Sequence, residues 1–104
     1  MIVVRVTFPI EGIEHASFEQ AMLDSVPKYE GIDGLIRKYY VSSDDKKFGG
    51  GIYLWQSREQ AEAWYNREWL ERITDAFGPP VLEYLECGIV VDNETNLITT
   101  KDAA

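Results

Sequence analysis

The single histidine of the chain, His15, is the side chain whose ordinary pKa best suits general acid–base chemistry near neutral pH. An imidazole titrates at about pH 6.5 in water, so its neutral form can accept a proton from a substrate. His15 stands beside Glu14, in a segment that we expect to form the loop before the first helix. A solvent-exposed histidine without a catalytic role is the simpler interpretation, and the sequence leaves both open.

Ligands for a metal ion or a phosphate group are not clustered in this sequence. Zinc and haem sites need grouped His, Cys or carboxylate ligands, whereas the single His15 and the single Cys87 are far apart. The glycine triplet at residues 49–51 is followed by strand-forming residues instead of the helix that a phosphate-binding loop requires. We therefore expect no metal site, and we expect the glycines to allow close backbone or ligand approach, or a bulge.

Aromatic side chains are abundant for a chain of 104 residues, and such side chains line apolar pockets as well as ordinary cores. Both interpretations stay open for the rings considered, which are Tyr39, Tyr53, Trp55, Trp64, Tyr65 and Trp69. Arg5 and Arg37 interrupt otherwise apolar strands. Each guanidinium needs a carboxylate such as Glu83 or Glu86, within or between subunits, or an anionic group of a ligand.

The elements that must position these residues follow from the spacing of apolar side chains. A strand is expected at residues 2–8, and a first helix is expected behind a capping box at Ser17 and Gln20, ending or kinking near Pro27. A second capping box at Ser57 and Gln60 predicts a second helix with a bend near residues 66–68. The remaining strands are expected at residues 35–41, 48–55 and 81–91.

This order of elements predicts an α+β fold of ferredoxin-like type, βαββαβ, with an antiparallel sheet and both helices on one face. The third and fourth strands are apolar on both faces, so the face without helices needs a cover, and a second copy packed sheet to sheet supplies one. We expect one domain at residues 1–92. The more polar residues 93–104 are expected to form an arm or tail.

The charge of the chain disfavours whole classes of partner. Its net charge of −8 repels nucleic acid and anionic membranes, and no cluster of Lys or Arg interrupts that field. The sequence shows neither a signal peptide nor a long apolar span, so a cytoplasmic location is expected.

A family resemblance is carried by residues 47–55, which read KFGGGIYLW, by residues 34–38, GLIRK, and by residues 61–65, AEAWY. These segments, with similar ones at residues 3–12 and 90–93, resemble the YdhR-like monooxygenases of the dimeric α+β barrel superfamily. The resemblance covers nearly the whole chain. Its most specific part is GGIYL followed by an aromatic residue, and it identifies a fold family better than a reaction.

The resemblance implies a homodimer with a pocket between helices and sheet, and relatives that oxidise polycyclic phenols without metal or flavin. We accordingly expect a monooxygenase without cofactor that acts on a small aromatic or polyketide-like substrate. On this view His15 is the base, Arg37 steadies an anionic oxygen, and the pocket is lined by Tyr39, Trp55, Trp64 and Tyr65.

Other functions on the same architecture stay open. A noncatalytic homodimer that binds a small hydrophobic ligand or serves as a structural module is one alternative, and an isomerase or lactone-processing enzyme that moves protons is another. Haem-degrading relatives need an axial histidine in the second helical region. Residues 57–77 contain none, which disfavours that activity.

Overall fold

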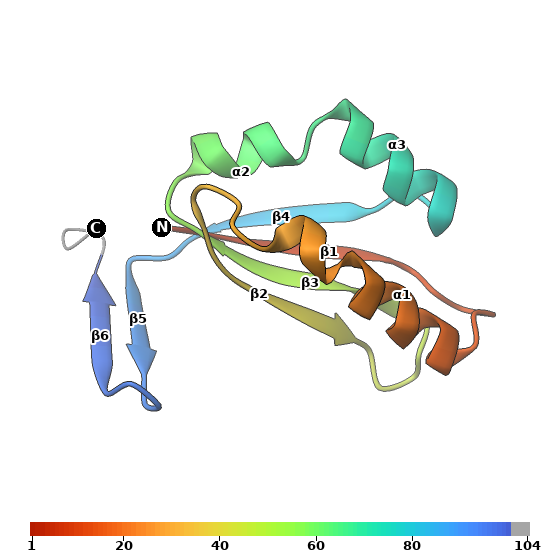
Figure 1. The fold of residues 1–104 in the computed structure, drawn as a ribbon, viewed down its shortest axis with the longest axis horizontal. Helices are drawn as coiled ribbons and strands as arrows, with labels where there is room; N and C mark the ends of the chain where they lie inside the picture. Colours follow the sequence, from red (N-terminus) through yellow and green to blue (C-terminus); the bar gives the residue numbers. More distant parts are fainter. Residues whose placement is uncertain (101–104) are drawn as a thin grey trace.

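The structure is a computed structural model in which residues 1–100 are described (Figure 1). Its elements follow the predicted order, with the second helical region divided in two and an additional hairpin at the end. The elements are β1 (Ile2–Pro9), α1 (His15–Tyr29), β2 (Leu35–Ser42), β3 (Phe48–Trp55), α2 (Arg58–Trp64), α3 (Arg67–Ala76), β4 (Val81–Glu86), β5 (Ile89–Asp92) and β6 (Leu97–Thr100).

The main sheet has the strand order β2-β3-β1-β4, and every neighbouring pair is antiparallel. All three helices lie on one face of this sheet, as Figure 1 shows. The predicted ferredoxin-like α+β fold is therefore confirmed. In this arrangement β1 lies in the interior of the sheet, which explains why its apolar residues dominate the core.

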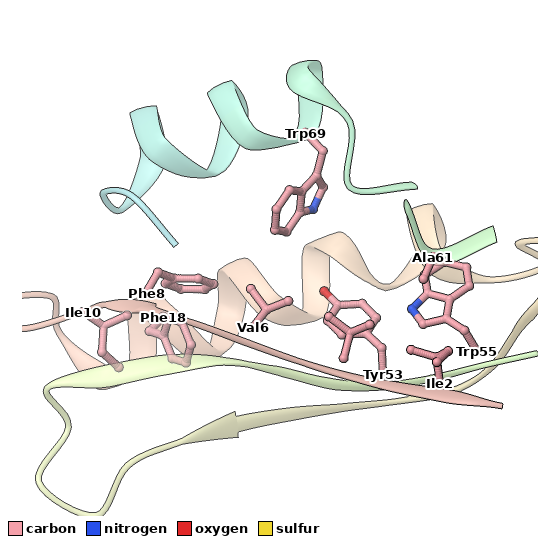
Figure 2. Close-up of a cluster of buried hydrophobic side chains, with 10 residues drawn as sticks. Ile2, Val6, Phe8, Ile10, Phe18, Tyr53, Trp55, Ala61 and Trp69 are labelled. Atoms are coloured by element: carbon pink, nitrogen blue, oxygen red, sulfur yellow. The ribbon is translucent and has the colours of Figure 1, made fainter. Parts of the chain in front are cut away.

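Alternation along β1 separates the two faces of the sheet. Val4 and Val6 face the helices and are 0% and 1% exposed, whereas Arg5 between them is exposed on the opposite face. Burying such an aliphatic side chain stabilises the fold by about 1.5–3 kcal/mol. Figure 2 shows the resulting core, in which Trp69 projects from α3 toward Val6 and Tyr53 on the sheet.

The second helical region begins where the sequence predicts. The Ser57 hydroxyl accepts the backbone N–H of Gln60 at 3.2 Å, which confirms Ser57 as the helix cap. The Gln60 side chain accepts from the Ser57 hydroxyl at 3.0 Å, so the contact is not the reciprocal one of a complete capping box. The predicted bend is a complete break, since α2 ends at Trp64 and α3 restarts behind Asn66, whose side chain accepts the Trp69 N–H at 2.9 Å. Each cap satisfies a backbone donor that has no partner inside its helix.

The first helix differs from its prediction at both ends. It starts at His15 and not at a Ser17 cap, because the Phe18 N–H already bonds to the Glu14 carbonyl at 3.0 Å. It also runs past Pro27 to Tyr29. A proline this close to the end of a helix removes a single backbone bond, and Tyr29 gains packing against the rings of Tyr40, Tyr53 and Trp64.

The strand predicted at residues 81–91 is wrong in extent. It ends at Glu86, and after Gly88 the chain forms a separate two-stranded sheet of β5 and β6. This hairpin projects from one end of the main sheet in Figure 1. The hairpin crosses the predicted boundary between a domain at residues 1–92 and an arm at residues 93–104, so this division stays a prediction. Residues 101–104 of the predicted arm lie outside the described part of the chain.

Between residues 1 and 100 the structure contains no helix that is both long and apolar enough to cross a membrane. The cytoplasmic location expected from the sequence stays a prediction.

Candidate active site

A cavity of about 220 Å³ lies between α1, α3 and the face of the sheet that the helices cover. We call it the helix-side cavity. Aromatic and aliphatic side chains make up most of its lining, including Phe8, Met22, Tyr53, Trp69 and Phe77. Pockets that bind small molecules are generally concave, apolar and provided with a few polar groups, which is the composition found here.

Glycines make room for this cavity on the sheet. A Cβ atom added to Gly51 would lie 2.9 Å from Cε1 of Tyr53 and 3.1 Å from Cε of Lys38. A Cβ atom on Gly50 would lie 1.8 Å from the carbonyl oxygen of Val6 on the neighbouring strand. The close backbone approach expected for the glycine triplet is thus confirmed, and it also gives the Lys38 side chain its space.

Lys38, on β2, brings an amine into the helix-side cavity. Its Nζ atom lies 3.3 Å from the ring centroid of Tyr29, 3.8 Å from that of Tyr40 and 4.8 Å from that of Tyr53. We call these three rings the tyrosine cage. Burial lowers the pKa of Lys38 from 10.5 to about 7, because the ammonium form loses its hydration. Among the described residues no carboxylate forms an ion pair with it.

The indole of Trp69 contributes an aromatic ring to the lining of the cavity. Trp69 is 2% exposed, and its buried Nε1 has no hydrogen-bond partner within residues 1–100. The Nε1 of Trp64 is also buried without a partner there, and the Trp64 ring lies 5.4 Å from the ring of Tyr29. A buried donor without an acceptor costs free energy, so both indoles lower the stability of the fold slightly where they lie.

Trp55 and Tyr65 lie beneath these groups in the core and do not line the cavity. The Trp55 Nε1 donates to the Tyr65 hydroxyl at 3.0 Å, and Trp55 is fully buried. Burial raises the pKa of Tyr65 far above its usual range. These two rings pack behind Tyr53, so they can shape the wall of the cavity without lining it.

His15 lies outside the helix-side cavity. It is exposed at the start of α1, and its Nε2 lies 2.6 Å from a carboxylate oxygen of Glu19 one turn later. It lines a separate groove of about 460 Å³ between α1 and β2, which shares only Met22 with the helix-side cavity. Among residues 1–100, no three His, Cys, Asp or Glu side chains are grouped so that they could hold a metal ion.

Arg37 and Tyr39 point to the opposite face of the sheet. The Arg37 guanidinium forms an ion pair with Asp92 at the end of β5. Its hydrogen bonds to the Tyr39 hydroxyl and to Asp92 raise the pKa of Arg37, and the hydrogen bond from Arg37 lowers the pKa of Asp92. Arg37 and Tyr39 line a cleft of about 480 Å³ between the sheet and the terminal hairpin. Arg5 on the same face pairs with Glu83 at 3.3 Å, which confirms one of the ion pairs expected from the sequence.

The orientation of Lys38 is not predictable from alternation along the sequence, because β2 contains an irregularity. Leu35 pairs with Trp55, but the next paired residue is Arg37, opposite Leu54, so the register shifts between them. Simple alternation from Leu35 would turn Arg37 toward the helices, whereas the shift turns Lys38 toward them. A signal that could have identified Lys38 lies in the neighbouring strand, because Gly51 on β3 has no side chain and leaves space beside Lys38 and Tyr40 on β2.

Comparison with known proteins identifies the family. A family model described as "Putative mono-oxygenase ydhR" matches residues 3–84. The chain belongs to this YdhR-like monooxygenase family. The match contains β1 through most of β4 and therefore includes every element that lines the helix-side cavity. No curated protein matches the chain by sequence at a significant level.

Solved structures share the fold of this YdhR-like protein. A "putative antibiotic biosynthesis monooxygenase" from Deinococcus radiodurans has a TM-score of 0.69 at 11% identity, covering 88% of this chain and 97% of its own. A monooxygenase from Streptomyces coelicolor in complex with nanaomycin D has a TM-score of 0.63 at 21% identity, covering 88% and 92%. A protein of unknown function from Nitrosomonas europaea has a TM-score of 0.68 at 13% identity, covering 83% and 87%.

Proposed function

We propose that this YdhR-like protein is a monooxygenase without cofactor that oxidises a small aromatic or polyketide-like substrate in the helix-side cavity. The observation that carries the proposal is the combination, in one cavity, of aromatic walls and the amine of Lys38. Family membership supports the reaction class. The Streptomyces coelicolor monooxygenase, bound to nanaomycin D, supports an aromatic ligand on this fold.

The size of the cavity favours the smaller substrates in this class. Its volume of about 220 Å³ is below the range of about 300–1,000 Å³ that is typical of sites for drug-sized ligands. A substrate of one or two fused rings fits that volume better than a large polyketide does.

The proposed chemistry needs no external reductant. A substrate whose ring methylene is conjugated to a carbonyl also exists as its phenol or enol tautomer, and the O–H of that tautomer loses a proton to the base. The resulting anion carries electron density at the former methylene carbon and is electron-rich enough to reduce oxygen. The anion adds O₂ to give a hydroperoxide, which loses water. The methylene thus becomes a carbonyl, with one oxygen atom in the product and the other in water. The protein supplies a base, a polar anchor and a site from which bulk water is excluded.

The residues predicted from the sequence take different parts in this proposal. Trp64, through Tyr29, and the core pair Trp55 and Tyr65 shape the wall of the cavity. His15 acts only if substrate also occupies the groove between α1 and β2. Arg37 and Tyr39 act only if a ligand binds on the other face of the sheet.

A homodimer through sheet faces is the second part of the proposal. The face of the sheet away from the helices, which we call the open face, carries Val3, Ile52, Leu54, Val81 and Leu85, with Val81 66% and Leu85 49% exposed. The Arg5–Glu83 ion pair lies among these apolar residues on the same face, so the face is apolar around one paired charge. Exposed apolar residues gathered on one face commonly mark interfaces. The radius of gyration of 14.5 Å also exceeds the value of about 13 Å expected for a compact chain of this length, which fits a hairpin that reaches toward a partner.

Oxygen uptake by metal-stripped protein tests the proposed reaction. We expect uptake with at least one member of a panel of anthrone-like compounds and their one- and two-ring analogues that carry an activated ring methylene. Ala21→Trp, which fills the helix-side cavity from α1, should abolish it, and Ala63→Trp, on an exposed position of α2 outside the cavity, should not. Tight binding without turnover would favour the noncatalytic alternative. Conversion of substrate without oxygen uptake would favour the isomerase.

A further inference from the structure

We propose that Lys38 is the base of this site and that it takes the phenolic or enolic proton of an acidic aromatic substrate. This inference rests on the proposed function and deepens it, because it names the proton acceptor and the class of substrate. The transfer breaks the O–H bond of the substrate and forms an N–H bond on the Nζ of Lys38. The electron pair stays on the substrate as an oxyanion, which the new ammonium group then faces.

The position of Lys38 allows it to act as a base. Its Nζ atom is enclosed by the tyrosine cage and lines the helix-side cavity, with no carboxylate among the described residues to hold the ammonium form. Burial brings the pKa of Lys38 to about 7, so a large fraction of the free amine is present at neutral pH. A base of this strength matches phenols and enols far better than it matches simple ketones.

The tyrosine cage also stabilises the protonated product. Ammonium groups are attracted to the faces of aromatic rings within about 6 Å, and the three ring centroids lie within 4.8 Å of Nζ. The three rings therefore contact the ammonium group of Lys38 after proton transfer, when the substrate anion that has just formed balances its charge. Lys38 can thus exist in both protonation states in the same place.

The other ionisable groups around the cavity favour an acidic substrate. Lys28 on α1 and Arg72 on α3 line it as well, whereas no Asp or Glu does, although the chain carries 18 acidic residues. These two exposed cations at the lining of the cavity attract anions. Burial raises the pKa values of Tyr40 and Tyr53 above their usual value, so both phenols stay neutral at pH 7 and neither competes with Lys38 as the base.

A coloured phenol tests this inference without any turnover. 4-Nitrophenol absorbs near 400 nm only as the phenolate, so its spectrum reports loss of the phenolic proton directly. Added to the wild-type protein at pH 7, where about half of Lys38 is the free amine and a large part of the 4-nitrophenol is still protonated, it should show a saturable increase in phenolate absorbance. Lys38→Met should lose this increase, and the matched control Lys47→Met, at an exposed turn lysine outside the cavity, should keep it. Absence of binding, or binding without ionisation by wild type, would overturn the inference.

Kinetics supply the second arm. With a substrate found by oxygen uptake, Lys38→Met should lower kcat/KM at least about 100-fold, since general bases contribute about 10²–10⁴-fold. The wild-type kcat/KM should rise with pH to a plateau above about 7, and this limb should vanish in the variant. Small primary amines should restore activity to Lys38→Ala, in order of their basicity. Such rescue is not expected of a residue with a purely structural role.

The two arms separate the two proposals. Phenolate formation on wild type without oxygen uptake from any substrate would refute the monooxygenase and leave Lys38 as a base. Oxygen uptake with an unchanged pH profile in Lys38→Met would refute the role of Lys38 and leave the monooxygenase. Circular dichroism of each variant should match that of wild type, because methionine preserves most of the volume of the lysine stem.

Discussion

Replacing Lys38 by methionine should change the pH dependence of stability in a direction that the structure fixes. Burial lowers the pKa of Lys38 from 10.5 to about 7. Between these two pH values the unfolded chain keeps Lys38 protonated while the folded chain releases the proton. The unfolded state therefore binds more protons, and the free energy of unfolding of the wild type rises with pH in this window. Below about pH 7 both states are protonated and the contribution of Lys38 is constant.

The magnitude follows from the same pKa difference. Each pH unit inside the window adds about 1.4 kcal/mol to the free energy of unfolding. Between pH 7 and pH 9.5 the wild type should gain about 2–3 kcal/mol that Lys38→Met does not gain. The lower figure allows for the attraction of the tyrosine cage for the ammonium group, which raises the folded-state pKa. All other titrating groups are common to both proteins and cancel in the difference.

Urea unfolding followed by tryptophan fluorescence is a suitable assay, because Trp55 and Trp69 are buried and will be exposed on unfolding. Curves for wild type, Lys38→Met and the control Lys47→Met at pH 6.5, 8 and 9.5 give the three free energies. The amount by which the free energy of unfolding of Lys38→Met exceeds that of wild type should shrink as the pH rises. A difference between the two proteins that is constant from pH 6.5 to pH 9.5 would show that Lys38 is not desolvated and would refute this reasoning.

Three further predictions concern the cavity wall, the dimer and a helix cap. Gly51→Ala should lower the free energy of unfolding by about 1–3 kcal/mol and abolish 4-nitrophenol ionisation, because the added Cβ would lie 2.9 Å from a ring atom of Tyr53. The control Gly88→Ala, whose Cβ would enter open space, should have neither effect. Urea unfolding measures the first effect and phenolate absorbance the second. In analytical ultracentrifugation, Leu85→Lys on the open face should convert the dimer into a monomer, and the control Leu70→Lys on α3 should not. A wild-type protein that sediments as a monomer at micromolar concentration would contradict the dimer. Asn66→Ala should lower stability by about 1 kcal/mol, measured by thermal unfolding, because the Trp69 N–H loses its acceptor.

The fold was largely predictable because local signals and the global arrangement agree. Alternation in β1 and the Ser57 cap each define an element, and a sheet with helices on one face is the arrangement that buries the apolar positions. The errors occurred where tertiary contacts decide. Pro27 is tolerated inside α1 because Tyr29 packs beyond it, and the chain turns at Cys87 and Gly88 into a hairpin that apolar content alone did not reveal.

The candidate site was less predictable than the fold. His15 was selected by its ordinary pKa, yet the structure places it in a different groove, and Arg37 lies on the other face of the sheet. Lys38 has an ordinary pKa that argues against catalysis at neutral pH. Only its burial against Tyr29, together with a register shift that no alternation pattern shows, makes it a candidate.

The most direct test of the central claim is a crystal structure of the protein with a phenolic ligand such as 4-nitrophenol. We predict that the ring will occupy the space between α1, α3 and the sheet, with its oxygen atom within hydrogen-bond distance of the Nζ of Lys38. A ligand bound only in the groove beside His15, or only in the cleft beside Arg37, would contradict the claim.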